Sequence, residues 1–291
     1  MVKTISQLYR EARKAIMSQE DEHIATLYAR NLVCHVTGKT PEQVIADGQS
    51  YVGEQTCKEM DQAVQRILAG EPLAYVLGQW DFYGMTLRVD KNVLIPRDDT
   101  CAVTALAIKQ SLFLDTSPRI MDLCTGSGCI GLAIASRVKD AKVTLADISR
   151  EALAVAKKNV TDMKLSARVS CVQADALGEP ANYLGKFDLI VSNPPYITAQ
   201  EMEQLPGSVK DYEPHLALYG GKDGLDFYRN IAGKYSIALK PGGYLCFEFG
   251  MGQGDDVCAI LCDNGYTVLE RVKDYNDTER AVLARYDRKE E

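Results

Sequence analysis

Apolar side chains in the first 75 residues recur at three- and four-residue spacing, which is the period of an amphipathic helix. Thr40 directly before Pro41 is typical of a helix start, and Gly70 with Pro72 ends the last stretch. The pattern therefore predicts a small helical domain over residues 1–75. Its apolar stripes are Ile5, Leu8, Tyr9, Ala12 and Ile16, then Ile24, Leu27, Tyr28, Leu32 and Val33, and finally Met60, Val64, Ile67 and Leu68.

The pattern changes after residue 75. Over residues 76–95, aromatic and branched side chains such as Trp80 and Phe82 lie between Gly78 and Gly84, which predicts a β-hairpin linker. Over residues 96–291, short apolar runs alternate with helical stretches, which indicates an open α/β sheet with helices on both faces. The predicted strands are 119–124, 142–146, 168–173, 187–192, 243–249, 266–271 and 281–285, and the predicted helices include 100–111, 129–138, 150–163, 224–238 and 255–264.

Composition and charge narrow the class of protein. The chain is 46% hydrophobic and 25% charged, which excludes a disordered chain, a collagen-like repeat and a coiled-coil rod. Its formal net charge is −7, whereas proteins that hold nucleic acid broadly usually present a basic face. No apolar stretch approaches the roughly 20 residues that span a bilayer. We therefore expect no direct nucleic-acid partner and no membrane partner.

The cysteines and the N-terminal stretch bear on the compartment. Nine cysteines are an odd number, and they form no CxxC pair and no His/Cys spacing suited to zinc, so no metal site is expected. We interpret them as reduced, mostly buried thiols. The first residues carry charges throughout and lack the apolar core of a signal peptide. Together these features predict a cytoplasmic protein.

A glycine-rich loop follows the first strand of the predicted sheet. Gly126, Gly128 and Gly131 have the spacing of the dinucleotide fingerprint, and they precede a helix whose N-terminal N–H groups favour a ligand. Asp147 ends the next strand, 21 residues after Gly126, where an acid accepts hydrogen bonds from ribose hydroxyls. This half of the pattern fits either a nicotinamide enzyme or an S-adenosylmethionine (SAM) methyltransferase.

Two further acids favour SAM. Asp122 lies beside the glycine turn, where a carboxylate suits the cationic amino-acid end of SAM better than a pyrophosphate. Asp175 follows the third strand, at the same carboxyl edge of the sheet. With Asp147, these acids are expected to hold the ammonium, the ribose and the adenine amino group.

The strand over 187–192 runs into Asn193-Pro194-Pro195-Tyr196, a rigid loop at the same edge. The Asn193 side-chain carbonyl and the Pro194 backbone carbonyl can accept both hydrogens of one planar NH₂ group. Tyr196 offers a ring face on which the attached planar group can stack. The tetrapeptide therefore indicates methyl transfer to a planar amino group.

This chemistry depends on positioning. An amide nitrogen is a poor nucleophile, and methyl transfer from a sulfonium requires its lone pair to point at the methyl carbon. Two acceptors on the NH₂ hydrogens orient that lone pair and stabilise the positive charge that develops on nitrogen. No strong general base is needed before transfer. Asn193 is the main predicted catalytic residue, with Pro194, Pro195 and Tyr196 completing the catalytic loop.

The combination resembles the HemK/PrmC family, the protein-(glutamine-N5) methyltransferases of peptide chain release factors. The resemblance extends over nearly the whole chain and is weak before residue 70. Besides the two loops, it rests on residues 71–84 and 94–97 (EPLAYVLGQWDFYG and LIPR) and on residues 212–225, from Tyr212-Glu213-Pro214 to Asp223-Gly224-Leu225. It implies a seven-stranded, Rossmann-like, SAM-dependent domain with a small N-terminal helical domain and a β-hairpin linker.

The resemblance also implies a substrate and a site. The substrate would be the glutamine of the release factor's Gly-Gly-Gln motif, and the helical domain would dock that partner. Phe82 and Arg97 would close over the cofactor. The implied SAM site is lined by Cys124, Thr125, Gly126, Ser127, Gly128, Asp147, Asp175, Ala176 and Asn193.

Three positions depart from the family pattern. Cys124 stands where the first loop glycine is usual, and a cysteine does not adopt positive φ without cost. Asp98-Asp99 replaces a common Pro-Glu. Ala176 replaces a frequent aromatic residue, which predicts that adenine is not stacked there.

Three other functions remain open from the residues alone. An enzyme that methylates the amino group of adenine or cytosine in nucleic acid would use the same tetrapeptide, although it would need basic groups to hold and extrude the base. A nicotinamide oxidoreductase would explain the glycine loop but not Asn193–Tyr196. A SAM-binding protein without catalysis would result if Cys124 or Asp98-Asp99 spoiled the cofactor site.

Overall fold

The computed structural model describes residues 2–114 and 117–287. The chain divides into two compact units, which are described one at a time. The first contains the residues up to Gln79 together with Gly207–Tyr212. The second contains Trp80–Pro206 and the residues from Glu213 onward.

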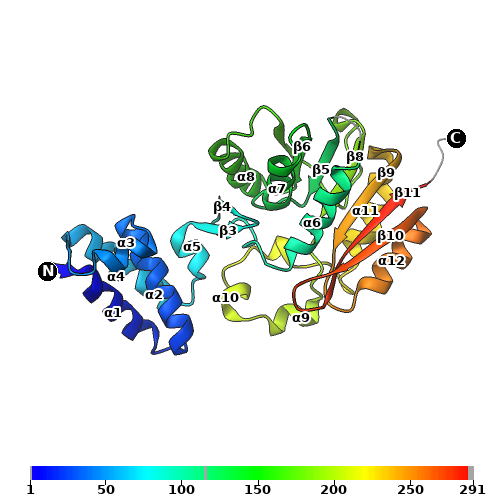
Figure 1. Ribbon diagram of the computed structural model, residues 1–291. Coiled ribbons are helices and arrows are strands. Elements are labelled where there is room, and N and C mark those ends of the chain that lie inside the picture. Colours follow the sequence, from blue (N-terminus) through cyan, green and yellow to red (C-terminus); the bar gives the residue numbers. More distant parts are fainter. Residues whose placement is uncertain (1, 115–116, 288–291) are drawn as a thin grey trace. The chain divides into compact units, whose positions relative to one another are not determined.

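The first unit is helical, as the apolar period predicts (Figure 1). Thr4 and Thr40 each cap a helix with a capping box, and Pro41 is the first residue of its helix. Its elements are β1 (Lys3–Thr4), α1 (Ile5–Ile16), α2 (Glu22–Thr37), α3 (Pro41–Ala46), β2 (Tyr51–Val52), α4 (Glu54–Leu68), α5 (Leu73–Leu77) and α10 (Gly207–Lys210).

The buried face of α2 differs from the predicted stripe. Ala25, Ala29, Leu32 and Val33 are buried, whereas Ile24, Leu27 and Tyr28 are only partly so. Small residues on this face let α2 approach α1 and α4, against which it packs. The predicted stripe is defined by the largest apolar side chains, and it therefore omits the alanines that form part of the buried face.

The second unit is built on one sheet with the strand order β10-β11-β9-β8-β5-β6-β7. All neighbours are parallel except that β11 runs antiparallel to β9 and β10. Its strands are β5 (Arg119–Leu123), β6 (Lys142–Asp147), β7 (Val169–Gln173), β8 (Phe187–Ser192), β9 (Leu239–Glu248), β10 (Tyr266–Lys273) and β11 (Glu279–Tyr286).

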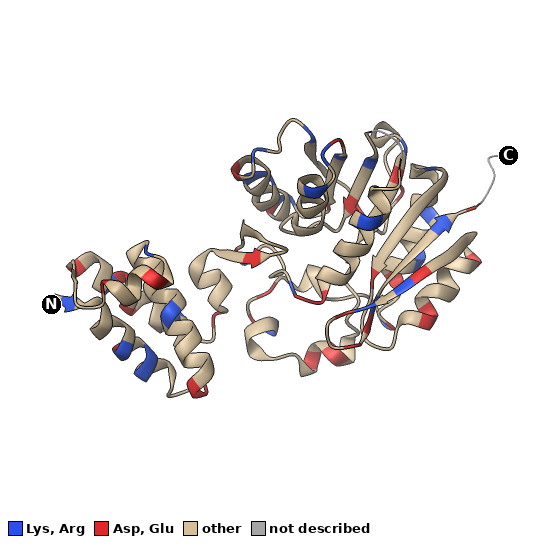
Figure 2. Ribbon diagram, viewed as in Figure 1, with Lys and Arg blue, Asp and Glu red and all other residues tan. Residues whose placement is uncertain are grey.

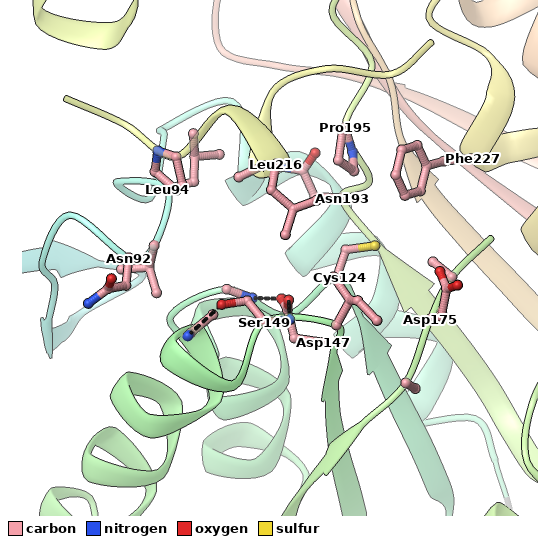
Figure 3. A pocket seen from close by; sticks show the side chains of 18 of the residues that line it. Asn92, Leu94, Cys124, Asp147, Ser149, Asp175, Asn193, Pro195, Leu216 and Phe227 are labelled. Carbon is pink, nitrogen blue, oxygen red and sulfur yellow. Dashed lines mark hydrogen bonds between the residues drawn. The ribbon is translucent and has the colours of Figure 1, made fainter. Parts of the chain in front are cut away.

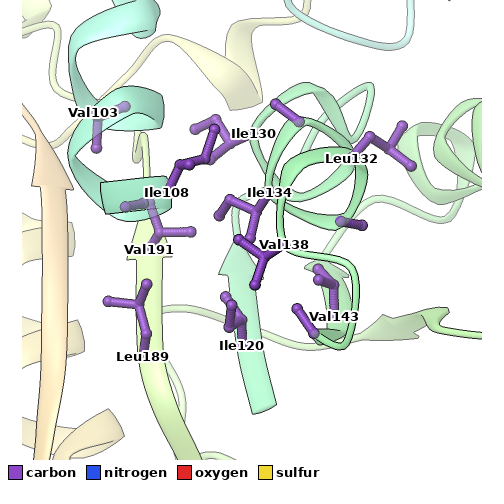
Figure 4. Packing of buried hydrophobic residues seen from close by; sticks show 14 of the residues in the cluster. Val103, Ile108, Ile120, Ile130, Leu132, Ile134, Val138, Val143, Leu189 and Val191 are labelled. Carbon is purple, nitrogen blue, oxygen red and sulfur yellow. The ribbon is translucent and has the colours of Figure 1, made fainter. Parts of the chain in front are cut away.

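Helices cover both faces of this sheet, which confirms the predicted α/β class. Because side chains alternate along a strand, Ile120 and Leu189 face one core, while Met121 and Ile190 face the other. The first core packs under α6, α7 and α8 (Figure 4), and the second under α11 and α12. The helices are α6 (Thr100–Ser111), α7 (Cys129–Arg137), α8 (Arg150–Asp162), α9 (Ala199–Gln204), α11 (Asp226–Lys234) and α12 (Gly254–Asp263), with 3₁₀ turns η1 (Asn182–Leu184), η2 (His215–Ala217) and η3 (Tyr235–Ala238).

The hairpin is shorter than the predicted linker. Its strands are β3 (Gln79–Phe82) and β4 (Met85–Arg88), while residues 73–77 form a helix that Gly78 ends in the left-handed conformation. The buried Asn159 of α8 joins the hairpin to the glycine loop. Its carboxamide pairs with the backbone N–H and C=O of Arg88 at 2.7 and 3.1 Å and donates to the Ser127 carbonyl at 2.9 Å.

The nine cysteines are unpaired, but only Cys57 and Cys246 are buried, so the prediction of mostly buried thiols is wrong. Acidic and basic positions are interleaved along both units (Figure 2). In the part of the chain that the structure describes, no helix is both long and apolar enough to cross a bilayer. The same residues contain no group of three or more His, Cys, Asp or Glu side chains that could hold a metal ion.

Asn159→Ala is expected to lower the free energy of unfolding by about 2–4 kcal/mol, because it leaves the buried Ser127 carbonyl and the partly buried backbone N–H and C=O of Arg88 unpaired. Urea unfolding measures this change. Asn230→Ala is the matched control, since the exposed Asn230 side chain donates only to a carbonyl of its own helix. Equal effects of the two substitutions would contradict the role assigned to Asn159.

Candidate functional site

The two chemically suggestive loops meet at one edge of the sheet because β5 and β8 are neighbours. Their register pairs Leu123 with Ser192, so the glycine loop and the Asn193 loop leave the sheet side by side. The Ser192 hydroxyl donates to the Leu123 carbonyl at 2.6 Å and ties the two strand ends together. The chain passes from β5 to β6 on one side and later returns to β8 on the other. This is the switch point at which open α/β sheets bind ligands.

A cavity opens at this edge (Figure 3). Its volume is about 830 Å³ when the part open to solvent is included. The residues of the cavity wall are Asn92, Val93, Leu94, Cys124, Gly126, Asp147, Ile148, Ser149, Ala152, Ala174, Asp175, Ala176, Leu177, Asn193, Pro195, Pro214, Leu216, Ala217 and Phe227.

The glycine loop presents Cys124 and Gly126 to the cavity. Cys124 adopts the left-handed conformation, with φ of 62°, so it takes the backbone shape for which glycine is usual at this position. The Gly126 N–H donates to the Asp147 carboxylate at 2.9 Å. The loop is therefore fixed to the end of β6, and Cys124 bears the conformational cost.

Thr125, Ser127 and Gly128 are not among the residues that line this cavity, so their predicted place in the SAM site stays a prediction. Thr125 and Ser127 are buried, because the tight turn directs alternate side chains into the protein. Gly128 adopts positive φ and begins α7, and its N–H donates to the Thr125 carbonyl. These residues shape the loop from behind.

Asp122 is not among the residues that line this cavity, and its predicted contact with the ammonium stays a prediction. Its side chain is fully buried. One carboxyl oxygen accepts from the Thr125 hydroxyl at 2.6 Å and from the Gly131 N–H at 2.9 Å. The other oxygen is buried without a partner among the described residues. Burial raises the pKa of Asp122 to about 7, although these two hydrogen bonds favour the charged form.

Asp147, Asp175 and Ala176 do line the cavity, as predicted. Asp147 ends β6, and its carboxylate accepts from the N–H groups of Gly126 and Ser149, both at 2.9 Å. Burial raises the pKa of this carboxyl, and these hydrogen bonds oppose the shift. Asp175 accepts from the Leu177 N–H at 2.9 Å. Two acids thus face the cavity from neighbouring strand ends.

Asn193 and Pro195 line the cavity, whereas Pro194 and Tyr196 do not. The Asn193 side-chain NH₂ donates to the Thr100 hydroxyl at 3.3 Å. Pro194 is buried, and Tyr196 packs partly into the core under α11 and α12. The predicted stacking face of Tyr196 is therefore outside the wall of this cavity.

The catalytic loop is held by close backbone packing. A Cβ on Gly220 would lie 2.5 Å from Tyr196 Cα, so only glycine fits there. The Ile197 N–H donates to the Leu218 carbonyl and the Gly220 N–H donates to the Ile197 carbonyl, both at 2.9 Å, so Ile197 is bridged to Tyr219. Gln253 donates to the Tyr196 carbonyl at 3.2 Å and accepts from the Gly250 N–H. The loop is thus rigid on the side away from the cavity.

Phe82 and Arg97 are not among the residues that line this cavity, and their predicted closing over the cofactor stays a prediction. Phe82 is buried in the core with Leu87. Arg97 forms an ion pair with the buried carboxylate of Glu213, which also accepts from the Ile95 N–H at 3.1 Å. They are a core aromatic residue and an ion pair that holds the chain at residues 95–97.

Several wall residues were missed from the sequence. Ile148 follows Asp147, and Leu177 lies two residues after Asp175. Both can be predicted as wall residues if the residues just after each strand-end acid are included in the site. Phe227 follows the Asp223-Gly224-Leu225 segment and faces the cavity in Figure 3. Leu94 comes from a loop and Leu216 from η2, and no local pattern predicts that either lines the cavity. The wall combines two acids with apolar surface, which fits a cationic, amphipathic cofactor such as SAM.

Comparison with known proteins gives an independent result. Residues 101–206 match the model of the methyltransferase small domain, and residues 7–78 match that of the PrmC N-terminal domain. The chain is 38% identical to a release factor glutamine methyltransferase of Clostridium acetobutylicum, covering 87% of this chain and 88% of that protein. It is 37% identical to the Chlorobaculum tepidum protein of the same description, covering 88% of each.

Solved structures share the fold. The hMettl16 catalytic domain, in complex with the MAT2A 3′UTR hairpin 6, has a TM-score of 0.56 and 15% identity, covering 83% of this chain and 86% of that chain. A methyltransferase from Pyrococcus furiosus has a TM-score of 0.50 and 19% identity, covering 78% and 98%. At these identities the likeness concerns the fold alone.

Cys124→Gly is expected to raise the free energy of unfolding by up to about 1 kcal/mol, because glycine adopts positive φ without strain, although it gains entropy in the unfolded chain. Cys101→Gly is the matched control. Cys101 lies in α6, where glycine should cost about 1 kcal/mol. Denaturant unfolding of both variants measures the difference. A clear loss of stability in Cys124→Gly would contradict the strain at this position.

Asp122→Asn tests the buried carboxyl by its pH dependence. A carboxyl whose pKa is raised on folding contributes stability that is lost as the pH rises from its unfolded pKa through its folded pKa, here about 7. The stability of the variant relative to the wild type should therefore increase between about pH 5 and 8, by about 1 kcal/mol or more. Urea titrations at both pH values measure this. A constant difference would show that Asp122 ionises as readily in the folded protein as in the unfolded chain.

Proposed function

Since the chain belongs to the family of release factor glutamine methyltransferases, we propose that it transfers a methyl group from SAM to the glutamine side-chain amide of the Gly-Gly-Gln motif in peptide chain release factors. The observation that carries this proposal is the position of Asn193 in the wall of the cavity beside the glycine loop. Acceptors for a planar NH₂ group thus lie next to a cofactor-sized space. The reaction supports translation termination.

The cavity supports the cofactor assignment through its chemistry. SAM, when bound, supplies an electrophilic methyl group on a sulfonium. Asp147 and Asp175 provide carboxylates for its ribose and adenine ends, and Ile148 and Leu177 provide apolar surface for the adenine ring. The Gly126 backbone leaves room for the amino-acid end. Ala176 offers no ring, so at this position the wall would give the adenine aliphatic surface only.

The chain's part in catalysis is to position one nitrogen. We assign the Asn193 side-chain oxygen and the Pro194 carbonyl as acceptors for the two amide hydrogens. Holding both hydrogens aims the nitrogen lone pair and stabilises the positive charge that develops there. The proton leaves after transfer. Pro195 forms the cavity wall beside Asn193, and Tyr196 offers the partly exposed side of its ring to the peptide of the substrate.

We assign the binding of the release factor to the helical unit. Residues 7–78 match the PrmC N-terminal domain and fold as a compact helical unit of their own. A separate unit of this kind suits recognition of a protein substrate, because it can offer binding surface besides the catalytic domain. We therefore propose that it docks the release factor.

Asn193→Ala is expected to lower kcat for release factor methylation by about 10²–10³-fold, the loss typical when one acceptor or donor to the developing charge is removed. SAM binding, measured by calorimetry, should change little. Mass spectrometry of the Gly-Gly-Gln peptide measures the methyl product. Asn230→Ala, on the exposed side of α11, is the control and should behave as wild type. Equal losses of methylation and of SAM binding would contradict the role of Asn193.

A further inference from the structure

Glu248 is a buried acid beside the catalytic loop that the mechanism above does not use. It is the last residue of β9, and the register pairs Ser192 of β8 with Phe247 of β9. Asn193 and Glu248, the next residues, therefore leave adjacent strands side by side. The Glu248 side chain is 1% exposed, and one of its carboxyl oxygens has no hydrogen-bond partner in the described part of the chain.

The Glu248 carboxyl lies beside the asparagine of the Asn193 loop, because β8 and β9 are paired neighbours. The polar side chains of Thr100 and Asn193 favour the charged form of Glu248 and so lower its pKa. Asn193 also donates its NH₂ to the Thr100 hydroxyl at 3.3 Å. Thr100 is itself buried at the start of α6. The three side chains form one small network, and Asn193 is its only member in the cavity wall.

A carboxylate forms hydrogen bonds with only one of the two ends of a carboxamide. An ionised carboxyl only accepts hydrogen bonds, so it binds the NH₂ end of an asparagine and repels the oxygen end. With its NH₂ directed at Thr100 and Glu248, Asn193 keeps its oxygen free for another donor. Catalysis in the proposed function requires this oxygen, because it accepts a hydrogen from the substrate amide.

We propose that Glu248, together with Thr100, is a positioning residue that holds the Asn193 carboxamide with its oxygen toward the substrate. The inference rests on the proposed function for its catalytic meaning. It assigns no proton transfer to Glu248. The role is to select one of two orientations that have nearly the same shape.

The protonation state of Glu248 then controls the orientation. Burial raises its pKa to about 8, and the charge of Asp99 adds to this shift, while Arg280 and the hydrogen bonds oppose it. Arg280 is shared, since it pairs with Asp99 at 3.0 Å and with Asp274 at 2.9 Å. A protonated carboxyl is a donor and can bind the asparagine oxygen instead. The charge of Glu248 also raises the pKa values of nearby titratable groups, namely Tyr196, Tyr228, Cys101 and Cys129.

The test compares the pH profiles of Glu248→Gln and the wild type. In the wild type, kcat should rise with pH as Glu248 ionises, with a midpoint near its pKa. Glutamine has nearly the same shape but can donate to the Asn193 oxygen at every pH. The variant should therefore have a kcat about 10²-fold lower, the loss expected of a misplaced catalytic group, with a flat profile and an unchanged KM for SAM.

A second variant tests the same network independently, in case Glu248→Gln does not fold. Thr100→Val keeps the side-chain shape and removes the hydroxyl that Asn193 contacts, so kcat should fall about tenfold, equivalent to one hydrogen bond. Thr104→Val is the matched control. It makes the same change one turn later in α6, where the hydroxyl donates only to the Thr100 carbonyl. The control should retain the activity of the wild type.

The side-chain amide signals of Asn193 in NMR spectra provide a readout that needs no methyl acceptor. They should titrate with Glu248 in the wild type and not in Glu248→Gln. An active wild type whose pH profile is shared by Glu248→Gln, or whose Asn193 signals do not titrate, would overturn this inference. A wild type that titrates as expected but methylates no release factor would overturn the proposed function and support the coupling between Asn193 and Glu248.

Discussion

The parallel pairing of β5 with β8 is the constraint on which the site depends. These strands are far apart in the sequence, yet their register sets Leu123 beside Ser192 and brings the glycine loop next to Asn193. The hydrogen bond from the Ser192 hydroxyl to the Leu123 carbonyl secures this alignment. A shift of one residue would turn the side chains of β8 to the opposite faces of the sheet. The cavity, the glycine loop at its edge and the position of Asn193 in its wall all follow from this one alignment.

Buried carboxyls support both loops from behind. Asp122 holds the turn of the glycine loop, and Glu248 contacts the asparagine of the catalytic loop. Burial raises the pKa of each, so each loop is stabilised by a group that is costly to ionise. These two buried carboxyls support the loops of the site from the protein interior, while Asp147 and Asp175 line the cavity.

The sequence predicts best those features that depend on residues close together in the chain. The period of apolar residues identified the sheet and its helices, and the ends of the predicted strands identified Asp147, Asp175 and Asn193. It was less informative where tertiary contacts decide. The burial of Asp122 and Phe82, the left-handed Cys124 and the walls at Leu94 and Leu216 depend on neighbours that are distant in the chain. The small residues on α2 show the same limit, because packing rather than hydrophobicity selected the buried face.

The most direct test of the central claim is the identity of the methyl acceptor. Purified protein is incubated with radiolabelled SAM and, in parallel, with a release factor, with the same factor lacking the Gly-Gly-Gln glutamine, with DNA and with ribosomal RNA. The account predicts label on the intact release factor alone. Label on a nucleic acid, with none on the release factor, would contradict it and would indicate an enzyme for the amino groups of bases.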